Sequence, residues 1–145
     1  MKTRFSALIS LKKNTMQKSE RVVQNANKNL LNAKEALRES LAELQNIDTP
    51  DHGLISDFLA NRMLLDSQRA IIAHNEAWVS YAQKELLEAK EQLKHDMIEY
   101  EKFKYLELQE IEKMLKAKKI KEAKDLDEVA LMTYAQKTEN SRQAS

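Results

Sequence analysis

Glycine and proline are almost absent from this chain. It has one residue of each among 145, and both lie in the stretch DTPDHG at residues 48–53. Because glycine and proline supply the backbone angles that tight turns need, a chain that holds them in one place is expected to reverse direction once. A compact domain of this length normally needs several short connections, so layered folds are disfavoured.

Cysteine is absent, which excludes disulfides and thiolate metal sites. His74 and His95 would lie about 31 Å apart on one helix, and none of the three histidines, which include His52, has a second histidine at the spacing of the HExxH motif. A chain with one glycine cannot form a glycine-rich phosphate loop. We therefore expect no catalytic residues, no metal and no cofactor, and predict that the protein is not an enzyme.

Long apolar runs are also missing. None approaches the ~20 residues that span a bilayer. The first residues, MKTRFSALISLKKN, contain an apolar stretch that Lys12 and Lys13 interrupt too soon for a secretory signal. A cytoplasmic location is expected.

Charge and good helix formers are plentiful. Charged residues make up 32% of the chain and aromatic residues 6%. Ala, Leu, Glu, Lys and Gln dominate, a balance typical of long solvated helices or coiled coil. Regularly spaced apolar residues argue against disorder.

Two heptad patterns flank DTPDHG, each alternating large residues with small or polar ones. The first has Ile9, Met16, Val23, Leu30, Leu37 and Leu44, alternating with Ser19, Ala26, Ala33 and Ser40. The second has Phe58, Leu65, Ile72, Val79, Leu86, Leu93 and Tyr100, alternating with Asn61, Gln68, Asn75, Ala82, Ala89, Asp96 and Phe103. Two such helices joined by a short polar connection are expected to pack antiparallel.

The predicted fold is therefore all-α: a long antiparallel two-helix coiled-coil hairpin whose second helix is longer than the first. Its boundaries are expected at about 3–47 for helix one, 48–55 for the turn, 56–136 for helix two and 137–145 for a polar tail, within a single domain over 1–145. Either Thr49, before Pro50, or Ser56 is expected to cap the second helix.

The pairing leaves the end of the second helix without a partner. If residues near 47 pair with those near 56, Phe5 lies near residue 98, and helical residues 100–130 project about 45 Å further. The apolar residues also change phase here; they are Leu106, Leu108, Ile111, Met114, Leu115 and Ile120. The stretch either folds back, frays, packs on a second copy, or forms a binding surface for another protein.

Net charge is +1, but basic residues are concentrated in two places. Residues 1–28 carry seven Lys or Arg and one Glu, and residues 113–124 carry six Lys and one Glu. The first stretch faces acidic residues of the second helix, so pairing within the hairpin accounts for much of it. The second has no such counterpart and suits an acidic partner surface. Scarce arginine and missing aromatics disfavour nucleic acid, and an amphipathic membrane-surface helix is a further rival.

Two stretches of sequence resemble the flagellar export protein FliJ family, whose counterparts serve non-flagellar type III secretion. They are FSALISLKKNTMQKSERVVQNANKNLLNAKEAL and YEKFKYLELQEIEKMLKAKKIKEAKDLDEVALMTY, separated by the short turn. The resemblance covers nearly the whole chain. It implies a coiled coil similar to the stalk subunit of rotary ATPases, which binds and promotes the hexameric export ATPase and links it to the export gate and to export chaperones.

The resemblance also implies where partners bind. The residues expected to face the ATPase are Phe5, Leu108, Ile111, Leu115, Lys116, Lys119 and Ile120. Those expected to face the cytoplasmic domain of the export gate are Leu65, Arg69, Ile72 and Glu76. A protein of this kind would be a monomer when free and would associate peripherally, through the export apparatus, with the cytoplasmic face of the inner membrane. The alternative is a coiled-coil adaptor or chaperone that acts as a homodimer or in another complex.

Overall fold

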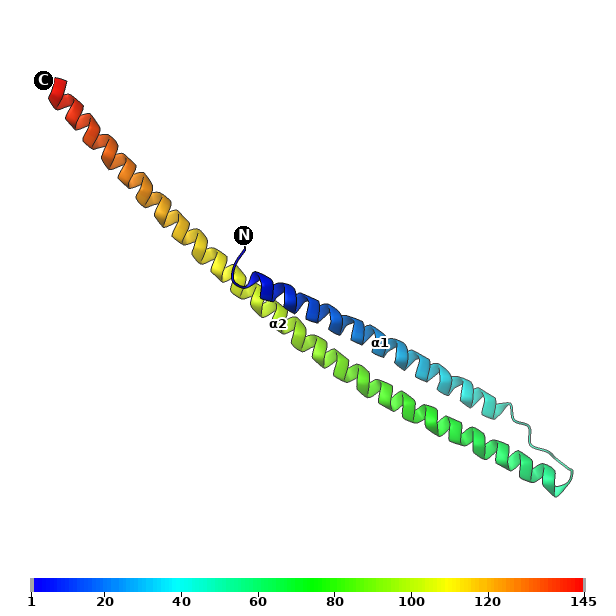
Figure 1. Ribbon diagram of the computed structural model, residues 1–145. Coiled ribbons are helices and arrows are strands. Elements are labelled where there is room, and N and C mark those ends of the chain that lie inside the picture. Colours follow the sequence, from blue (N-terminus) through cyan, green and yellow to red (C-terminus); the bar gives the residue numbers. More distant parts are fainter. Residues whose placement is uncertain (1, 145) are drawn as a thin grey trace. The chain divides into compact units, whose positions relative to one another are not determined.

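The computed structural model describes residues 2–144 and contains two helices joined by one connection (Figure 1). Helix α1 spans Ser6–Gln45 and helix α2 spans Ile55–Ala144. The predicted all-α hairpin with a longer second helix is confirmed. The described chain forms two compact units, a hairpin unit of residues 12–99 and a second unit of residues 2–11 with 100–144. The single domain expected over residues 1–145 stays a prediction.

The polar tail expected from residue 137 is instead helical as far as Ala144. No glycine or proline interrupts the chain after Gly53, so each added residue can continue the helical hydrogen bonding. The hydroxyls of Thr133 and Thr138 donate to the carbonyls of Val129 and Tyr134, four residues earlier, at 2.9 and 3.0 Å. These polar side chains therefore bond within the helix and do not end it.

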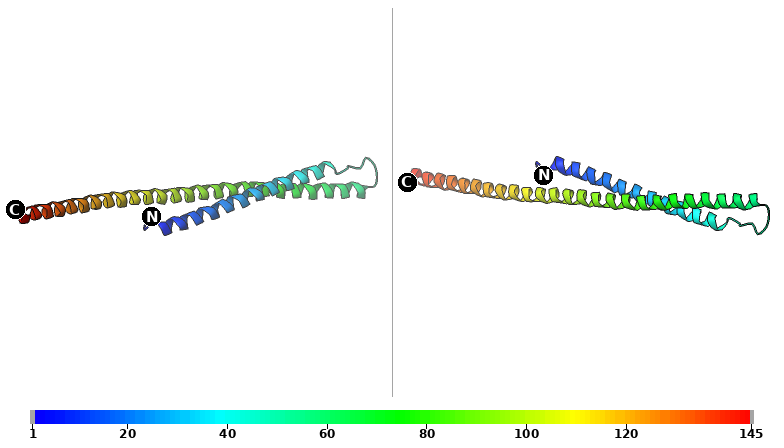
Figure 2. Two further views of the ribbon diagram at one scale, coloured as in Figure 1. Left: turned by 90° about the horizontal axis from the view of Figure 1, so that it is seen from above. Right: turned by 90° about the horizontal axis from the view of Figure 1, so that it is seen from below.

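In the hairpin unit, residues 12–99, α1 and α2 lie side by side and cross at a shallow angle (Figure 2). The small core positions let the two backbones approach closely, as the heptad pattern predicted. Ala33 and Ala82 are the most buried, at 0% and 1% exposure, and Ala26 and Ala89 are also buried. The larger apolar residues of the pattern flank this line of alanines and are mostly half-buried.

Polar side chains of α2 bond to α1 and to the connection near the turn. Three side-chain amides of α2, seven residues apart, donate to main-chain carbonyls on the other side of the hairpin. The bonds run from Asn61 to Asp48 (2.7 Å), from Gln68 to Ser40 (2.8 Å) and from Asn75 to Ala36 (3.1 Å). The buried Gln68 and Asn75 fix the register, because a shifted pairing would leave their amides unsatisfied.

The register differs from the expected one. In the hairpin unit, the Ser19 hydroxyl donates to the carboxylate of Asp96, which also accepts from Gln92. In the other unit, the ring of Phe5 lies 6.4 Å from that of Phe103, not near residue 98 as expected. The first turns of α2 are not paired with α1, since Leu54 and Ile55 are more than 70% exposed. Pairing of α2 with α1 therefore begins further along α2 than expected, and the contacts of the N-terminal residues with α2 also lie further along it.

The N-terminal residues contact α2 in the second unit. The Thr3 hydroxyl donates to the Glu107 carboxylate at 3.0 Å, and Arg4 forms an ion pair with Glu110 at 3.7 Å. The part of α2 without a partner in this unit therefore begins after Glu110, about ten residues later than expected.

The connection depends on Gly53, whose φ of 140° is unfavourable for residues with a side chain. A Cβ at this position would lie 2.8 Å from a carboxylate oxygen of Asp57. That carboxylate accepts a hydrogen bond from the Leu54 amide at 3.1 Å, in the manner of the third residue of a capping box. Neither Thr49 nor Ser56 is the cap, because α2 begins at Ile55 and Asp57 satisfies the amide that precedes it.

Candidate protein-interaction site

The candidate site is the part of α2 that follows Glu110. From residue 112 to residue 143 every residue is exposed. Large apolar side chains remain in water along it: Met114, Leu115, Ile120, Leu126, Val129, Leu131, Met132 and Tyr134. A helix without tertiary contacts depends on intrinsic propensity, and the many Ala, Lys, Glu and Leu residues provide it. Exposed apolar helix surface on this scale is typical of an interface.

The expected ATPase-facing residues do not share one face. Leu108, Ile111, Leu115 and Lys119 are three or four residues apart and lie along one side of α2. Ile120 follows Leu115 by five residues, which places it about 140° around the helix, on the same side as Lys116. Among these residues Ile111 is half-buried and the rest are exposed.

The lysines of residues 113–124 are available to a partner. Within the described chain, none of them forms an ion pair. Lys119 lies one turn after Leu115, so a charge borders the apolar side formed by Leu108, Ile111 and Leu115. This arrangement suits a partner surface that is apolar at its centre and acidic at its edge.

Phe5 has a packing role. Its ring is half-buried beside Phe103, and the Arg4 guanidinium lies 5.0 Å from its centroid. These contacts hold the N-terminal residues on α2. Contact of Phe5 with an ATPase stays a prediction.

The expected gate-facing residues separate into two kinds. Ile72 is buried at 8% exposure and Leu65 is half-buried, and both occupy core positions of the hairpin. Ile72 is covered by α1 in this structure, and contact of Leu65 and Ile72 with the gate stays a prediction. Arg69 and Glu76 are exposed, and Arg69 lies 3.7 Å from Asp66. The gate contact stays a prediction for Arg69 and Glu76.

Two exposed apolar groups were missed from the sequence. One is the continuation of the candidate site, where Leu126 and Val129 line a shallow hollow with Glu122 and Asp125. Its signal was present in the spacing of DLDEVALMTY. The other is a row on the hairpin unit formed by Leu64, Ile71, Trp78 and Tyr81. The sequence indicates this row by two adjacent large residues at every seventh position, of which the first is exposed. The pairs are Leu64 with Leu65, Ile71 with Ile72, and Trp78 with Val79.

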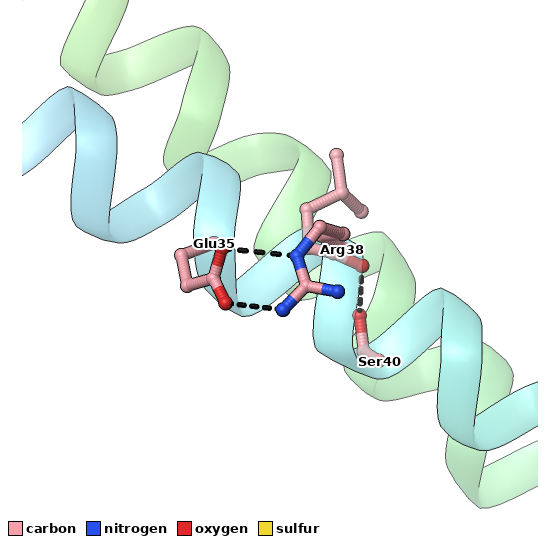
Figure 3. A network of polar contacts seen from close by, with 4 residues as sticks. Glu35, Arg38 and Ser40 are labelled. Carbon is pink, nitrogen blue, oxygen red and sulfur yellow. Dashed lines mark hydrogen bonds and ion pairs between the residues drawn. The ribbon is translucent and has the colours of Figure 1, made fainter.

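Two polar contacts lie within α1, one on its exposed side and one at the buried Ser40. Arg38 donates from two nitrogens to the carboxylate of Glu35, and the Ser40 hydroxyl donates to the Leu37 carbonyl at 2.9 Å (Figure 3). The hydrogen bond from Arg38 lowers the pKa of Glu35. Glu35 and Arg38 are exposed and lie three residues apart, so their pair is a solvent-screened contact within one helix.

The described residues contain neither a candidate metal site nor a candidate membrane span. No group of three or more His, Asp or Glu side chains there could hold a metal ion. No helix in that part of the chain is both long and apolar enough to cross a bilayer.

Comparison with known proteins gave one match. The family model described as Flagellar FliJ protein matches residues 1–139, which include all of α1 and nearly all of α2. No curated protein and no solved structure matches the chain.

Proposed function

The chain belongs to the flagellar FliJ protein family, whose members are components of the flagellar export apparatus and generally non-catalytic coiled coils, and on this basis we propose a stalk-like accessory role. In this role the protein binds and promotes the hexameric export ATPase. It also links the ATPase to the export gate and to export chaperones. It acts at the cytoplasmic face of the inner membrane.

One observation carries the proposal: the exposed stretch of α2 after Glu110. Apolar side chains and unpaired lysines lie together there, without contacts to the rest of the described unit. Burying such side chains in a partner contributes about 25 cal/mol per Å² of apolar surface, so each deeply buried Leu or Ile adds one to three kcal/mol. Lysines at the edge add attraction to an acidic surface and speed association.

Promotion of the ATPase follows from linkage. A protein that binds the assembled ring more tightly than separate subunits shifts the equilibrium towards the ring. Since Leu108, Ile111 and Leu115 occupy one side of α2 and Ile120 another, a partner that surrounds the helix can contact all four. A flat partner surface would contact only one side.

The test is the hydrolysis rate of the cognate export ATPase with and without the purified protein. We expect the rate to rise. A variant with Lys116→Glu, Lys118→Glu and Lys119→Glu should lose most of this effect while keeping its thermal melting midpoint. A matched control reverses three exposed lysines of the hairpin unit, Lys28→Glu, Lys34→Glu and Lys84→Glu, and should still raise the rate.

A second candidate is a homodimeric adaptor or chaperone, which the exposed apolar side chains of α2 also suit. Sedimentation separates the two. A monomer that raises the ATPase rate supports the stalk-like role. A stable dimer without effect on the ATPase contradicts it, as does an equal loss of rate enhancement and folding in the lysine variant.

A further inference from the structure

The hairpin unit has two unlike flanks beside its core. We name the first the aromatic flank; it comprises Val22, Asn25, Asn29, Ala36 and Glu43 of α1 with Leu64, Ile71, His74, Trp78, Tyr81, Glu85 and Glu88 of α2. We name the second the basic flank; it comprises Lys13, Glu20 and Lys34 of α1 with Arg62, Arg69, Glu76 and Lys90 of α2. In each case the residues occupy heptad positions on one side of the core, where the two helices of a coiled coil border each other.

Contacts confirm that α1 and α2 both form the aromatic flank. Val22, Asn25 and Asn29 line one shallow groove together with Glu85 and Glu88. Closer to the turn, the Glu43 carboxylate accepts a hydrogen bond from Gln68 of α2 at 3.3 Å. Residues of both helices therefore form this flank of the hairpin unit.

Apolar side chains of α2 stand exposed on this flank. Leu64, Ile71 and Trp78 are seven residues apart and are 54%, 47% and 38% exposed. Trp78 and Tyr81 form the wall of a hollow with His74 and Ala77. Partly exposed Trp and Tyr side chains of this kind are frequent at the energetic centres of protein interfaces.

The charge beside the groove is acidic. The flank carries Glu43, Glu85 and Glu88; Lys18 occupies the same heptad position as Asn25 one heptad earlier but does not line the groove. The Tyr81 phenol donates a hydrogen bond to Glu85, which raises the pKa of Tyr81. This bond connects the aromatic residues of the flank to its acidic residues. An occupant must therefore present apolar side chains to Ile71 and Trp78, and positive charge one to three turns further along.

We propose that the aromatic flank binds a basic amphipathic helix of a partner protein, which lies along the groove as a third helix. Its apolar side contacts Ile71, Trp78 and Tyr81, and its Lys or Arg side chains pair with Glu85 and Glu88. This surface is separate from the residues proposed for the ATPase, which follow Glu110. It is also separate from Arg69 and Glu76, which lie on the basic flank.

The chain provides its own probe, because Trp78 is its single tryptophan. A synthetic amphipathic helical peptide of Leu and Lys is titrated into the full-length protein while the emission of Trp78 is recorded. A peptide with the same Leu positions and Glu in place of Lys is the matched control. We expect a saturable change in emission with the Leu and Lys peptide and none with the Leu and Glu peptide.

Variants locate the binding surface. Ile71→Gln should weaken binding about tenfold, the change that about 1.4 kcal/mol of lost contact produces. Glu85→Gln combined with Glu88→Gln should weaken it similarly and reduce its dependence on salt. Arg69→Gln combined with Lys90→Gln, on the basic flank, should leave the affinity unchanged. Circular dichroism melts check that each variant remains folded, and all should still raise the ATPase rate.

Three results would overturn the inference. The first is equal binding of both peptides, and the second is binding that Ile71→Gln and the double Glu variant leave unchanged. The third is self-association of the protein that the double Glu variant abolishes, since the basic residues 113–124 of a second copy would then be the occupant. Loss of the ATPase effect alone would count against the proposed function and not against this surface.

Discussion

Single polar residues have large effects in this hairpin because its core is narrow. Asp96 is 7% exposed, and its carboxylate accepts hydrogen bonds from Ser19 across the core and from Gln92 on its own helix. A buried carboxylate that loses a donor retains the cost of leaving water, which is about 1–3 kcal/mol for a buried polar group and more for a charge.

The substitution Ser19→Ala removes the donor that α1 provides to Asp96. We expect it to lower the free energy of unfolding by about 1–3 kcal/mol. Urea denaturation followed by circular dichroism measures the change. Ser10→Ala is the control, since Ser10 is exposed on the same helix. Equal effects of the two substitutions would mean that the bond to Asp96 contributes nothing.

Tyr81 gives a residue-level prediction for pH. Its raised pKa results mainly from the hydrogen bond to Glu85, so the phenol stays neutral to higher pH than an ordinary tyrosine. The stabilising contribution is complete below the ordinary pKa of about 10 and is lost as pH rises through the raised value. Glu85→Ala should lower the pKa of Tyr81 towards the ordinary value. Ultraviolet titration of phenolate, with the Tyr81→Phe spectrum subtracted, measures it; an unchanged midpoint would contradict the assignment.

At the scale of elements, the connection determines where the helices begin to pair. Gly53 adopts a φ of 140°, and Asp57 beside it accepts the Leu54 amide at the start of α2. The polar core residues that follow, Asn61, Gln68 and Asn75, bond to main-chain carbonyls on the other side of the hairpin. The turn and these amides together specify one register.

The substitution Gly53→Ala should destabilise the hairpin by about 1–2 kcal/mol, because φ is unfavourable and the new Cβ would lie 2.8 Å from Asp57. Thermal melts measure the loss. In a protein that also carries Asp57→Ala, the clash between the new Cβ and the Asp57 carboxylate is absent. Gly53→Ala should therefore lower the melting midpoint less in that protein. A neutral or stabilising effect in the unaltered background would show that the connection adopts another conformation in solution.

At the scale of the whole molecule, stability and partner binding are expected to depend on different parts of the chain. The buried residues all lie in the hairpin unit, from Ser19 to Asp96, whereas residues 112–143 are exposed. A chain that ends at Glu110 should therefore keep its melting midpoint and lose its effect on the export ATPase. A large fall in the midpoint would mean that the C-terminal stretch of α2 contributes to the hairpin.

The heptad pattern and the single turn were enough to predict the helices, their order and their antiparallel pairing, because periodicity and backbone chemistry are local properties. Three expectations were wrong. The tail is helical because no residue there interrupts hydrogen bonding along the helix. The cap involves Asp57, which reaches back to Leu54. The register is displaced, since the ring of Phe5 lies beside that of Phe103 and not near residue 98.

The sequence by itself determined that this protein is a helical hairpin with an exposed basic stretch late in α2, since composition, spacing and charge can be read without a partner. Only the tertiary structure decided the register, because pairing depends on which of several buried polar groups bond across the core. It also decided that Val22 and Asn29 of α1 share a groove with Glu85 of α2. Side chains far apart in sequence become one surface only when the register is set.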